Sequence, residues 1–484
     1  MKSRRRYIAA VVLAALIVGA AAYLFELQQG PSCSQPLGGN KVLKSQLSSV
    51  SFGAVTKFKL PSPDRNPNGV IVAPDGSVWF GEQTIPGVGH IFPNGTLVEY
   101  AWPFSYPTQS GSGQGCSPKT EIWGITLWNG NVWAADTAGN QIVGLTPASD
   151  SFQTIKLRQN DSYPYSLTID PENSLWFTEL FASKIGRVDL NGTLHEYSLP
   201  GGNRGVPSAI VFVNKTLGYY SDAGQAGAGN GGVYSFNPDH FSPELVTGGR
   251  KLNLPTSLAL SHGGVWLALH GSSQIAFYDF TQRAWKSYPT STVTYVKTTL
   301  PYFIESNGST IWFNEHYGNR MAMVDPDKSQ LTEYSLSKPP ATSGSDIDNA
   351  LTFALGRGRA WFTEWTANYV GFVDMGYRPT FSVSVDNSTL SLASGDTKSV
   401  TVTLSGQSPN PLALKFSDSE SFTGTSKNIN ISTDQQSIPS LNGQERITVH
   451  IQAGTQLSAG PYTIAITGSD GLISRSTYIE LSVT

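Results

Sequence analysis

The sequence predicts an all-β protein built from a seven-bladed β-propeller, residues 51–378, and an immunoglobulin-like β-sandwich, residues 379–484. Two observations predict this architecture. A strand motif led by an aromatic residue recurs seven times at intervals of about 43 to 54 residues, the spacing of four-stranded propeller blades. After Phe381 the motif stops, and runs of alternating apolar and polar residues take over. A third observation, an apolar run near the N-terminus, predicts one transmembrane helix ahead of both domains.

The repeat is most complete at residues 174–200, SLWFTELFASKIGRVDLNGTLHEYSLP. Each unit predicts an apolar strand, a turn, a Trp-Phe strand, an IGRVD-like strand, an Asn-Gly turn and an EYSLP-like strand. Four strands joined by tight turns form one antiparallel blade. The leading aromatic residues of the seven units are Trp79, Trp133, Trp176, Tyr219, Trp266, Trp312 and Trp361.

The two ends of the repeat region predict how the last blade is completed. The seventh unit ends at GFVDMGYRP without its EYSLP-like strand, whereas a free copy of that strand, VTKFKLP at residues 55–61, precedes the first unit. We expect the N-terminal strand to complete the seventh blade, because this removes the exposed edge that an open arrangement would leave.

The C-terminal region contains the segments FSVSVD, SVTVTLSG, ITVHIQAG, YTIAITG and YIELSVT, which alternate as half-buried strands do. An immunoglobulin-like sandwich without a disulfide is expected. No catalytic motif is evident in it, so it is interpreted as a spacer, adhesive or stabilising module.

The N-terminal region predicts membrane attachment. Residues 7–25, YIAAVVLAALIVGAAAYLF, carry no charge and would span about 28 Å as a helix. The basic residues before this run favour the cytoplasmic side; they are Lys2, Arg4, Arg5 and Arg6. Residues 1–29 are therefore expected to be a basic tip and signal anchor, and residues 30–50 a linker. A cleaved signal peptide followed by secretion is the alternative.

Composition narrows the choice of partners and compartment. The formal net charge is −3, without a basic field that would attract nucleic acid. The two cysteines, Cys33 and Cys116, would lie on the outer side, where they could form a disulfide or stay unpaired. Seven Asn-x-Ser/Thr sequons are typical of an exposed extracytoplasmic glycoprotein; they begin at Asn94, Asn160, Asn191, Asn214, Asn307, Asn387 and Asn430.

Three residues after each leading aromatic residue the chain usually carries a carboxylate. These positions hold Glu82, Asp136, Glu179, Asp222, Leu269, Glu315 and Glu364. A group needed once for chemistry would not recur in nearly every blade. We therefore predict that these carboxylates accept hydrogen bonds from the following turn, and that function resides in the deviations from the repeat.

The unit WFTE, KIGR, Asn-Gly and EYSLP, in seven copies over residues 51–376, resembles the virginiamycin B lyase (streptogramin lyase) family of seven-bladed propellers. The resemblance implies a Mg²⁺-assisted lyase that opens a cyclic depsipeptide ester by removing a proton α to a carbonyl. In that family the base is a His at the start of the innermost strand of the last blade, with a second His one blade earlier. Here those positions hold Asn349 and Tyr302, so the family's base is missing.

Two other histidines offer a substitute constellation. His270 and His316 each lie four residues after the leading Trp of adjacent blades. With nearby carboxylates they could form a divalent-metal site, with Mg²⁺ as the implied ion and a His as base; the candidate ligands are Glu315, Asp346, Asp348 and Glu364. The alternative is that both histidines are exposed loop residues.

Aromatic and amide residues are expected to converge on the mouth of the central funnel. The predicted funnel residues are Asn68, Trp123, Tyr165, Tyr302, Asn349 and Trp365. Such a mixture favours an amphipathic small molecule, glycan or peptide, although the same residues could simply plug the channel. The sequence thus predicts a membrane-anchored extracytoplasmic binding module that needs no cofactor. A Mg²⁺-dependent lyase and a structural envelope protein are the alternatives.

Overall fold

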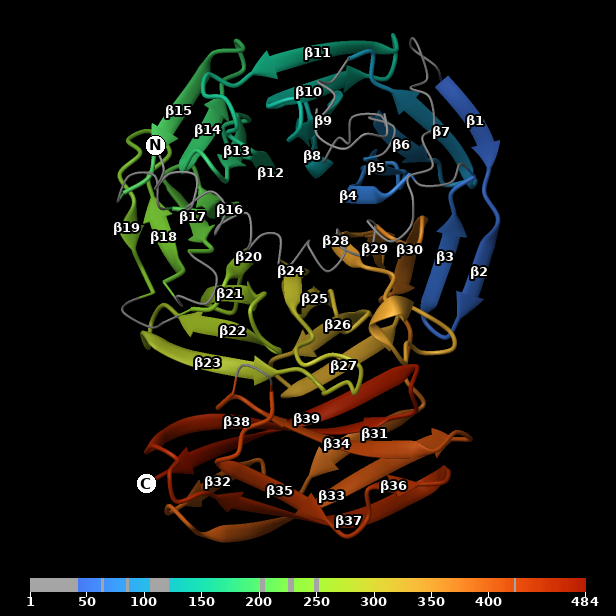
Figure 1. The fold of residues 1–484 in the computed structure, drawn as a ribbon, viewed down its shortest axis with the longest axis vertical. Coiled ribbons are helices and arrows are strands. Elements are labelled where there is room, and N and C mark those ends of the chain that lie inside the picture. The colour runs from blue at the N-terminus through green and yellow to red at the C-terminus, as the bar shows by residue number, and fades with distance from the viewer. Residues whose placement is uncertain are drawn as a thin grey trace, which may run out of the picture. The chain divides into compact units, whose positions relative to one another are not determined.

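The computed structural model describes residues 42–61, 65–83, 87–104, 122–200, 205–224, 230–247, 252–421 and 424–484 (Figure 1). The chain divides into two compact units: Leu60–Thr256 with the described residues up to Leu47, and Ser257–Thr484 with Ser48–Lys59. The expected anchor, Cys33 and Cys116 lie outside the described residues. No helix within the described ranges is long and apolar enough to cross a bilayer.

The first unit contains four antiparallel sheets with the strand order of propeller blades. Their strands, in chain order, are β4 (Pro67–Val72), β5 (Val78–Glu82), β6 (Gly87–Ile91) and β7 (Thr96–Ala101); β8 (Ile122–Trp128), β9 (Asn131–Asp136), β10 (Gln141–Thr146) and β11 (Ser151–Lys156); β12 (Pro164–Ile169), β13 (Leu175–Glu179), β14 (Lys184–Val188) and β15 (Leu194–Ser198); and β16 (Pro207–Asn214), β17 (Leu217–Asp222), β18 (Gly232–Phe236) and β19 (Glu244–Leu245). An additional strand, β1 (Val42–Gln46), pairs with β7.

The second unit contains three further blades. Their strands are β20 (Pro255–Ser261), β21 (Gly264–Leu269), β22 (Gln274–Asp279) and β23 (Ala284–Pro289); β24 (Pro301–Ser306), β25 (Ile311–Glu315), β26 (Arg320–Asp325) and β27 (Gln330–Ser335); and β28 (Ala350–Gly356), β29 (Arg359–Glu364) and β30 (Tyr369–Asp374). The last blade has only three strands from its own repeat. One short 3-10 helix, η1 (Gly344–Asp346), precedes β28.

The strand missing from the last blade comes from the N-terminal segment, as predicted. β3 (Val55–Lys59) pairs antiparallel with β30, in a register that places Val55 opposite Val373 and Lys59 opposite Tyr369. β2 (Ser49–Phe52) then pairs with β3 as a fifth strand. In Figure 1 the blue β3 lies beside the orange β30. The prediction from the VTKFKLP copy is confirmed.

A buried ion pair accompanies this closure. Lys57 on β3 places its Nζ 2.7 Å from Glu364 and 3.0 Å from Asp348, and it donates to the backbone oxygen of Leu336 at 2.9 Å. Burial alone would lower the pKa of Lys57, but the Coulomb attraction of Glu364 and Asp348 outweighs it and raises that pKa. Lys57 is therefore held charged inside the seventh blade.

Close packing inside a blade explains the Gly of the IGRVD-like strand. Gly186 lies opposite Phe177 of the preceding strand. A Cβ atom added at Gly186 would meet the Phe177 ring at 2.0 Å. The aromatic ring of the Trp-Phe strand therefore lies flat over the glycine, and any larger residue there would displace it.

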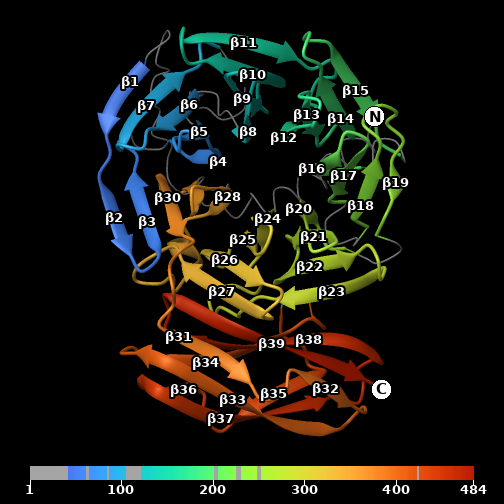
Figure 2. The ribbon, with the colours of Figure 1, turned by 180° about the vertical axis from the view of Figure 1, so that it is seen from behind.

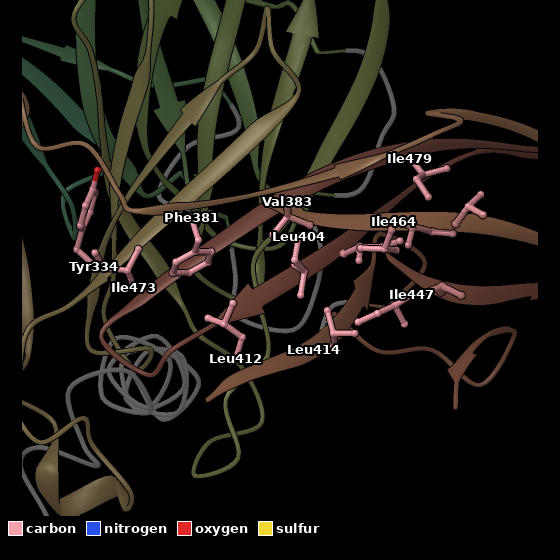
Figure 3. Close-up of a cluster of buried hydrophobic side chains, with 14 of the residues drawn as sticks. Tyr334, Phe381, Val383, Leu404, Leu412, Leu414, Ile447, Ile464, Ile473 and Ile479 are labelled. Carbon is pink, nitrogen blue, oxygen red and sulfur yellow. The ribbon is translucent and has the colours of Figure 1, made fainter. Parts of the chain in front are cut away.

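The C-terminal region forms two sheets that pack face to face. One contains β31 (Phe381–Val385), β33 (Thr397–Ser408), β37 (Leu441–Ala453) and β35 (Ile429–Thr433) in that order. The other contains β39 (Ile473–Val483), β38 (Gly460–Ser469), β34 (Leu412–Asp418) and β36 (Ser437–Ile438), with β32 (Thr389–Leu392) parallel to β39. Figure 3 shows side chains of both sheets, including Leu404 and Ile464, meeting in one apolar core.

The second sheet of the sandwich continues a propeller blade. β39 pairs antiparallel with β27, from Gln330 opposite Thr477 to Tyr334 opposite Ile473. The result is one nine-stranded sheet, in which eight strands follow one another from β24 to β36 and β32 pairs with β39 off this path; Figure 2 shows it from behind. The C-terminal domain is thus joined to the sixth blade by backbone hydrogen bonds, whereas the chain enters it from the seventh blade.

We predict that Lys57→Met lowers the free energy of unfolding by about 3 kcal/mol or more, because it leaves buried carboxylates without their cation. Lys59→Met is the matched control, since Lys59 lies on the same strand but is exposed; its effect should stay within about 0.5 kcal/mol. Urea unfolding followed by tryptophan fluorescence measures both. Equal stability of the two variants would contradict a stabilising role for Lys57.

Candidate functional site

The strand registers define equivalent positions at the start of each blade. Pro67 lies opposite Glu82, Pro164 opposite Glu179, and Pro301 opposite Glu315. The residues that follow in these and the second blade occupy one equivalent position, as predicted; they are Asn68, Trp123, Tyr165 and Tyr302.

The seventh blade departs from the predicted register. Ala350 lies opposite Glu364, so the position equivalent to Tyr302 is Leu351 and not Asn349. Asn349 instead matches Leu300, and both have a positive φ, 53° and 52°. Asparagine adopts this left-handed conformation more readily than most residues. Asn349 therefore belongs to the turn before the strand, and its assignment to the innermost strand was wrong.

In the first unit, aromatic residues of two neighbouring blades come together. The rings of Trp123 and Tyr165 lie 5.2 Å apart between centroids, and both side chains are half-buried, whereas Asn68 is fully buried. These residues provide a stacking surface within that unit.

In the second unit, the structure brings His270 and His316 together. Their rings are 5.6 Å apart and nearly parallel. The Tyr302 ring lies 4.7 Å from His270 and 6.1 Å from His316. Both histidines are only 1% exposed, so the alternative of exposed loop histidines was wrong. The three rings form a compact cluster, termed here the histidine cluster together with Asn349.

The backbone between the fifth and sixth blades holds this cluster in place. Leu300 donates its N–H to the Ser272 oxygen and accepts a hydrogen bond from the His316 N–H at 3.0 Å. The preceding residue, Thr299, accepts hydrogen bonds from the N–H groups of Tyr317 and Gly318. The segment Thr299–Leu300 thus bridges the turn that follows His270 and the turn that contains His316.

Asn349 connects the histidine cluster to the surface. His316 Nε2 lies 2.9 Å from Asn349 Oδ1, and Asn349 Nδ2 donates to the hydroxyl of the exposed Thr366 at 3.3 Å. Because the amide nitrogen of Asn349 donates to Thr366, its oxygen accepts from His316 Nε2–H. In the neutral ring this leaves the lone pair on His316 Nδ1, which has no hydrogen-bond partner among the described residues. Trp365 is half-buried and donates its backbone N–H to the backbone carbonyl oxygen of Asn349.

Both imidazoles are neutral at pH 7. Burial lowers the pKa of His316 to about 4, although its hydrogen bond to Asn349 opposes the shift. Burial, and then the neighbouring His316, lower the pKa of His270 well below its usual value; the carbonyls of Leu300 and Pro301 offset this only in part.

The expected metal carboxylates are engaged elsewhere. Glu364 and Asp348 both pair with Lys57, and the backbone N–H of Asp348 donates to Asn319 Oδ1. Asp346 is exposed and accepts hydrogen bonds from Thr342 and Ser343 in its own turn. These contacts lower the pKa of Asp346, chiefly through the backbone of Thr342.

Glu315 is part of a separate buried network. Arg320 lies 3.1 Å from Glu333 and bonds the hydroxyl of Ser291. Burial, with a contribution from Glu333, raises the pKa of Glu315 well above its usual range despite Arg320. Within the described ranges no three His, Cys, Asp or Glu side chains are grouped to hold a metal ion. The prediction of one Mg²⁺ site among these carboxylates therefore does not fit the structure, because Glu364 and Asp348 pair with Lys57, Asp346 bonds within its own turn, and Glu315 lies beside Arg320 and Glu333.

The recurring carboxylates behave as predicted in some blades. Asp136 accepts hydrogen bonds from the Gly139 N–H and from the Gln141 side chain. Asp222 likewise accepts from the backbone of Val206 and Gly224. In the sixth and seventh blades the neighbouring groups are Arg320 and Lys57 instead.

Sequence reasoning missed three contributors to the site: Lys57, Thr366 and the segment Thr299–Leu300. Only Lys57 could have been noticed in the sequence. The segment VTKFKLP carries Lys at the position where LTEYSLS, the equivalent segment of the sixth blade at residues 331–337, carries Glu. Gly371 lies opposite Lys57 just as Ala322 lies opposite Glu333. A charge reversed within a repeat indicates a different ionic partner.

Comparisons with known proteins agree with this architecture. No family model matches the chain. A virginiamycin B lyase from Nocardia farcinica is 26% identical over 152 residues, 31% of this chain and 48% of that protein, so the chain spans about half of the length of this curated relative. Crystal structures of virginiamycin B lyase from Staphylococcus aureus and of a streptogramin B lyase each match with a TM-score of 0.53, at 19% and 21% identity.

Those two matches cover 66% of this chain and 98% and 96% of theirs. A catalytically inactive variant of the Staphylococcus aureus enzyme, crystallised with quinupristin, gives the same TM-score. The chain is therefore a virginiamycin B lyase-like β-propeller, which confirms the predicted resemblance at the level of fold.

We predict that His316 contributes to acid destabilisation. Its pKa is about 4 when folded and about 6.5 when unfolded, so below pH 6.5 the unfolded chain gains a proton that the folded chain does not. The contribution of His316 to the free energy of unfolding should fall by up to about 3 kcal/mol between these two pH values and stay level above them.

The test compares urea unfolding at about pH 7 and about pH 4.5. His316→Gln should lose less stability on acidification than the wild type, and His240→Gln, at an exposed site, should match the wild type. An unchanged pH response in His316→Gln would refute the assignment of a neutral buried imidazole.

Proposed function

We propose that this virginiamycin B lyase-like β-propeller is a ligand-binding module, and that its histidine cluster recognises a neutral, amphipathic, peptide-like molecule. The observation that carries the proposal is the polar line from Thr366 through Asn349 to His316. It connects an exposed hydroxyl to a buried imidazole whose Nδ1 acceptor is not engaged by any residue that the structure describes. A ligand amide that reaches this line would find both hydrogen-bonding groups and the flanking aromatic rings.

The charges of the groups around the histidine cluster favour an uncharged ligand. His270 and His316 are uncharged at pH 7, because burial lowers the pKa of each. The nearby carboxylates Glu364 and Asp348 share the single cation Lys57, and burial raises the pKa of Glu364 well above its usual range, which favours its neutral form. A charged ligand would have to displace Lys57 or enter without a counter-charge, both of which are costly in a buried site.

A lyase reaction is the second candidate, favoured by the lone pair of His316 Nδ1, which accepts no hydrogen bond within the described part of the chain. A neutral imidazole can accept a proton from carbon, although a pKa near 4 makes His316 a weak base. The carboxylates suggested by the sequence do not fit a shared Mg²⁺ ion, because Glu364 and Asp348 pair with Lys57.

The two ends of the chain complete the proposal. We infer that residues 7–25 anchor the protein in a membrane as a single span, with the propeller on the outer side and glycosylation possible at the sequons. The C-terminal sandwich is proposed to be immunoglobulin-like. Alternating strands and an apolar core between two sheets support this.

We predict that quinupristin, the ligand crystallised with the Staphylococcus aureus enzyme, binds the wild type in isothermal titration calorimetry. Asn349→Gly should weaken this binding by up to about tenfold, because it removes the amide hydrogen bonds while glycine tolerates the positive φ. Asn129→Gly, an exposed positive-φ asparagine in the second blade, is the matched control and should bind like the wild type.

Binding that is equal in the wild type and Asn349→Gly, or absent from both, would contradict this site and ligand class. Chromatography of the bound quinupristin separates the two candidate functions. An isomer of unchanged mass that elutes separately indicates ring opening by elimination, whereas unchanged quinupristin indicates binding alone.

We also predict that the full-length chain stays with the membrane fraction after an alkaline carbonate wash and is released by detergent. An uncharged helix of this length partitions into the bilayer strongly enough to resist such a wash. Release of the intact chain by carbonate alone would contradict the proposed anchor.

A further inference from the structure

We propose that the C-terminal sandwich positions the histidine cluster, and that Gly424 and Tyr478 are the positioning residues through which it acts. This goes beyond the proposed function, because it concerns how the cluster is held and does not require a ligand. The inference rests on two independent sets of contacts between the sandwich and the fifth blade, both within the second unit.

The first contact lies at Gly424, in the turn that follows β34. A Cβ atom added at Gly424 would lie 3.3 Å from Ser273 Cβ and 3.6 Å from Ser417 Cβ. Asp418 fixes this turn, since its N–H donates to the Gly424 oxygen at 2.7 Å and its carboxylate accepts from the Ser426 N–H. A side chain at position 424 would therefore press on Ser273, three residues after His270.

Hydrogen bonds through Thr299 and Leu300 link Ser273 to the histidine cluster. The hydroxyl oxygen of Ser273 accepts a hydrogen bond from the Thr299 N–H at 3.0 Å. Thr299 in turn accepts from the backbone of Tyr317, and Leu300 accepts from the backbone of His316. A displacement of Ser273 by a few tenths of an ångström therefore moves the segment that aligns His316.

The second contact lies at Tyr478 on β39. Its hydroxyl donates to the Pro289 oxygen at 3.1 Å, and its ring lies 5.3 Å from that of Tyr288. Thr290, which follows Pro289 in the chain, shares a 2.7 Å hydrogen bond between its hydroxyl and that of Thr299. This route reaches Thr299 without passing through Gly424.

The shared sheet makes these contacts effective. Because β39 pairs with β27 over five successive residue pairs, the sandwich cannot swing freely about its linker. Its contacts with Ser273 and Pro289 are then fixed in register with the sixth blade, which carries His316.

The test uses the full chain labelled with ¹⁵N-histidine and records the imidazole signals of His270 and His316 by NMR, assigned with His270→Gln and His316→Gln. Gly424→Ala is compared with Gly443→Ala. Both glycines have a positive φ, 77° and 102°, but an added Cβ at Gly443 would meet nothing within 4 Å. Backbone strain is thus present in both variants and contact with Ser273 in only one.

We expect Gly424→Ala to shift the His316 signals by more than a line width and Gly443→Ala to leave them in place. Tyr478→Phe should shift them too, while Tyr462→Phe, which removes a comparable hydroxyl-to-carbonyl bond to Ser458 within the sandwich, should not. Tyr478→Phe keeps the test decisive if Gly424→Ala does not fold. Unmoved His316 signals in Tyr478→Phe, or equal shifts in the control variants, would overturn the proposal.

Discussion

The buried pairing of Lys57 with Glu364 and Asp348 is the interaction on which the seventh blade and the candidate site both depend. It joins a strand from the start of the chain to two carboxylates that follow 291 or more residues later. Asp348 precedes Asn349, whose side chain bonds His316. The cation that completes the last blade therefore also fixes the turn that orients the buried imidazole. A buried charge without its partner is costly. Loss of the Lys57 pairing would therefore disturb both the pairing of β3 with β30 and the turn that holds Asn349.

Much of the fold could be predicted because it repeats. The aromatic spacing identified the blades, and the free VTKFKLP copy identified the strand that completes the seventh. The alternation after Phe381 likewise predicted a second β domain. The pairing of β39 with β27 could not be foreseen, because an edge strand accepts any partner of suitable length and the choice depends on tertiary contacts such as that between Tyr478 and Pro289.

The site was predicted less well, for physical reasons that differ among residues. Proximity of His270 and His316 followed from their equivalent positions in adjacent blades. Their burial did not, since a turn in a propeller is covered or exposed according to its neighbours. Asn349 was misplaced because the blade lacks the usual Pro and has Ala350 in its stead. The metal carboxylates Glu364 and Asp348 were misjudged because the cation that pairs with both, Lys57, comes from the N-terminal strand β3, far from them in the sequence.

The pairing of β3 with β30 also bears on how this chain reaches its native state. When β3 leaves the ribosome, its partner has yet to be synthesised, and nearly the whole propeller must be made before the two can meet. Contacts of such long range slow folding, because the entropy of closing the intervening chain is lost before the contact stabilises anything. Until then β3 is an unpaired strand open to pairing with the wrong edge. Completion of the seventh blade must therefore follow the synthesis of nearly all of the propeller.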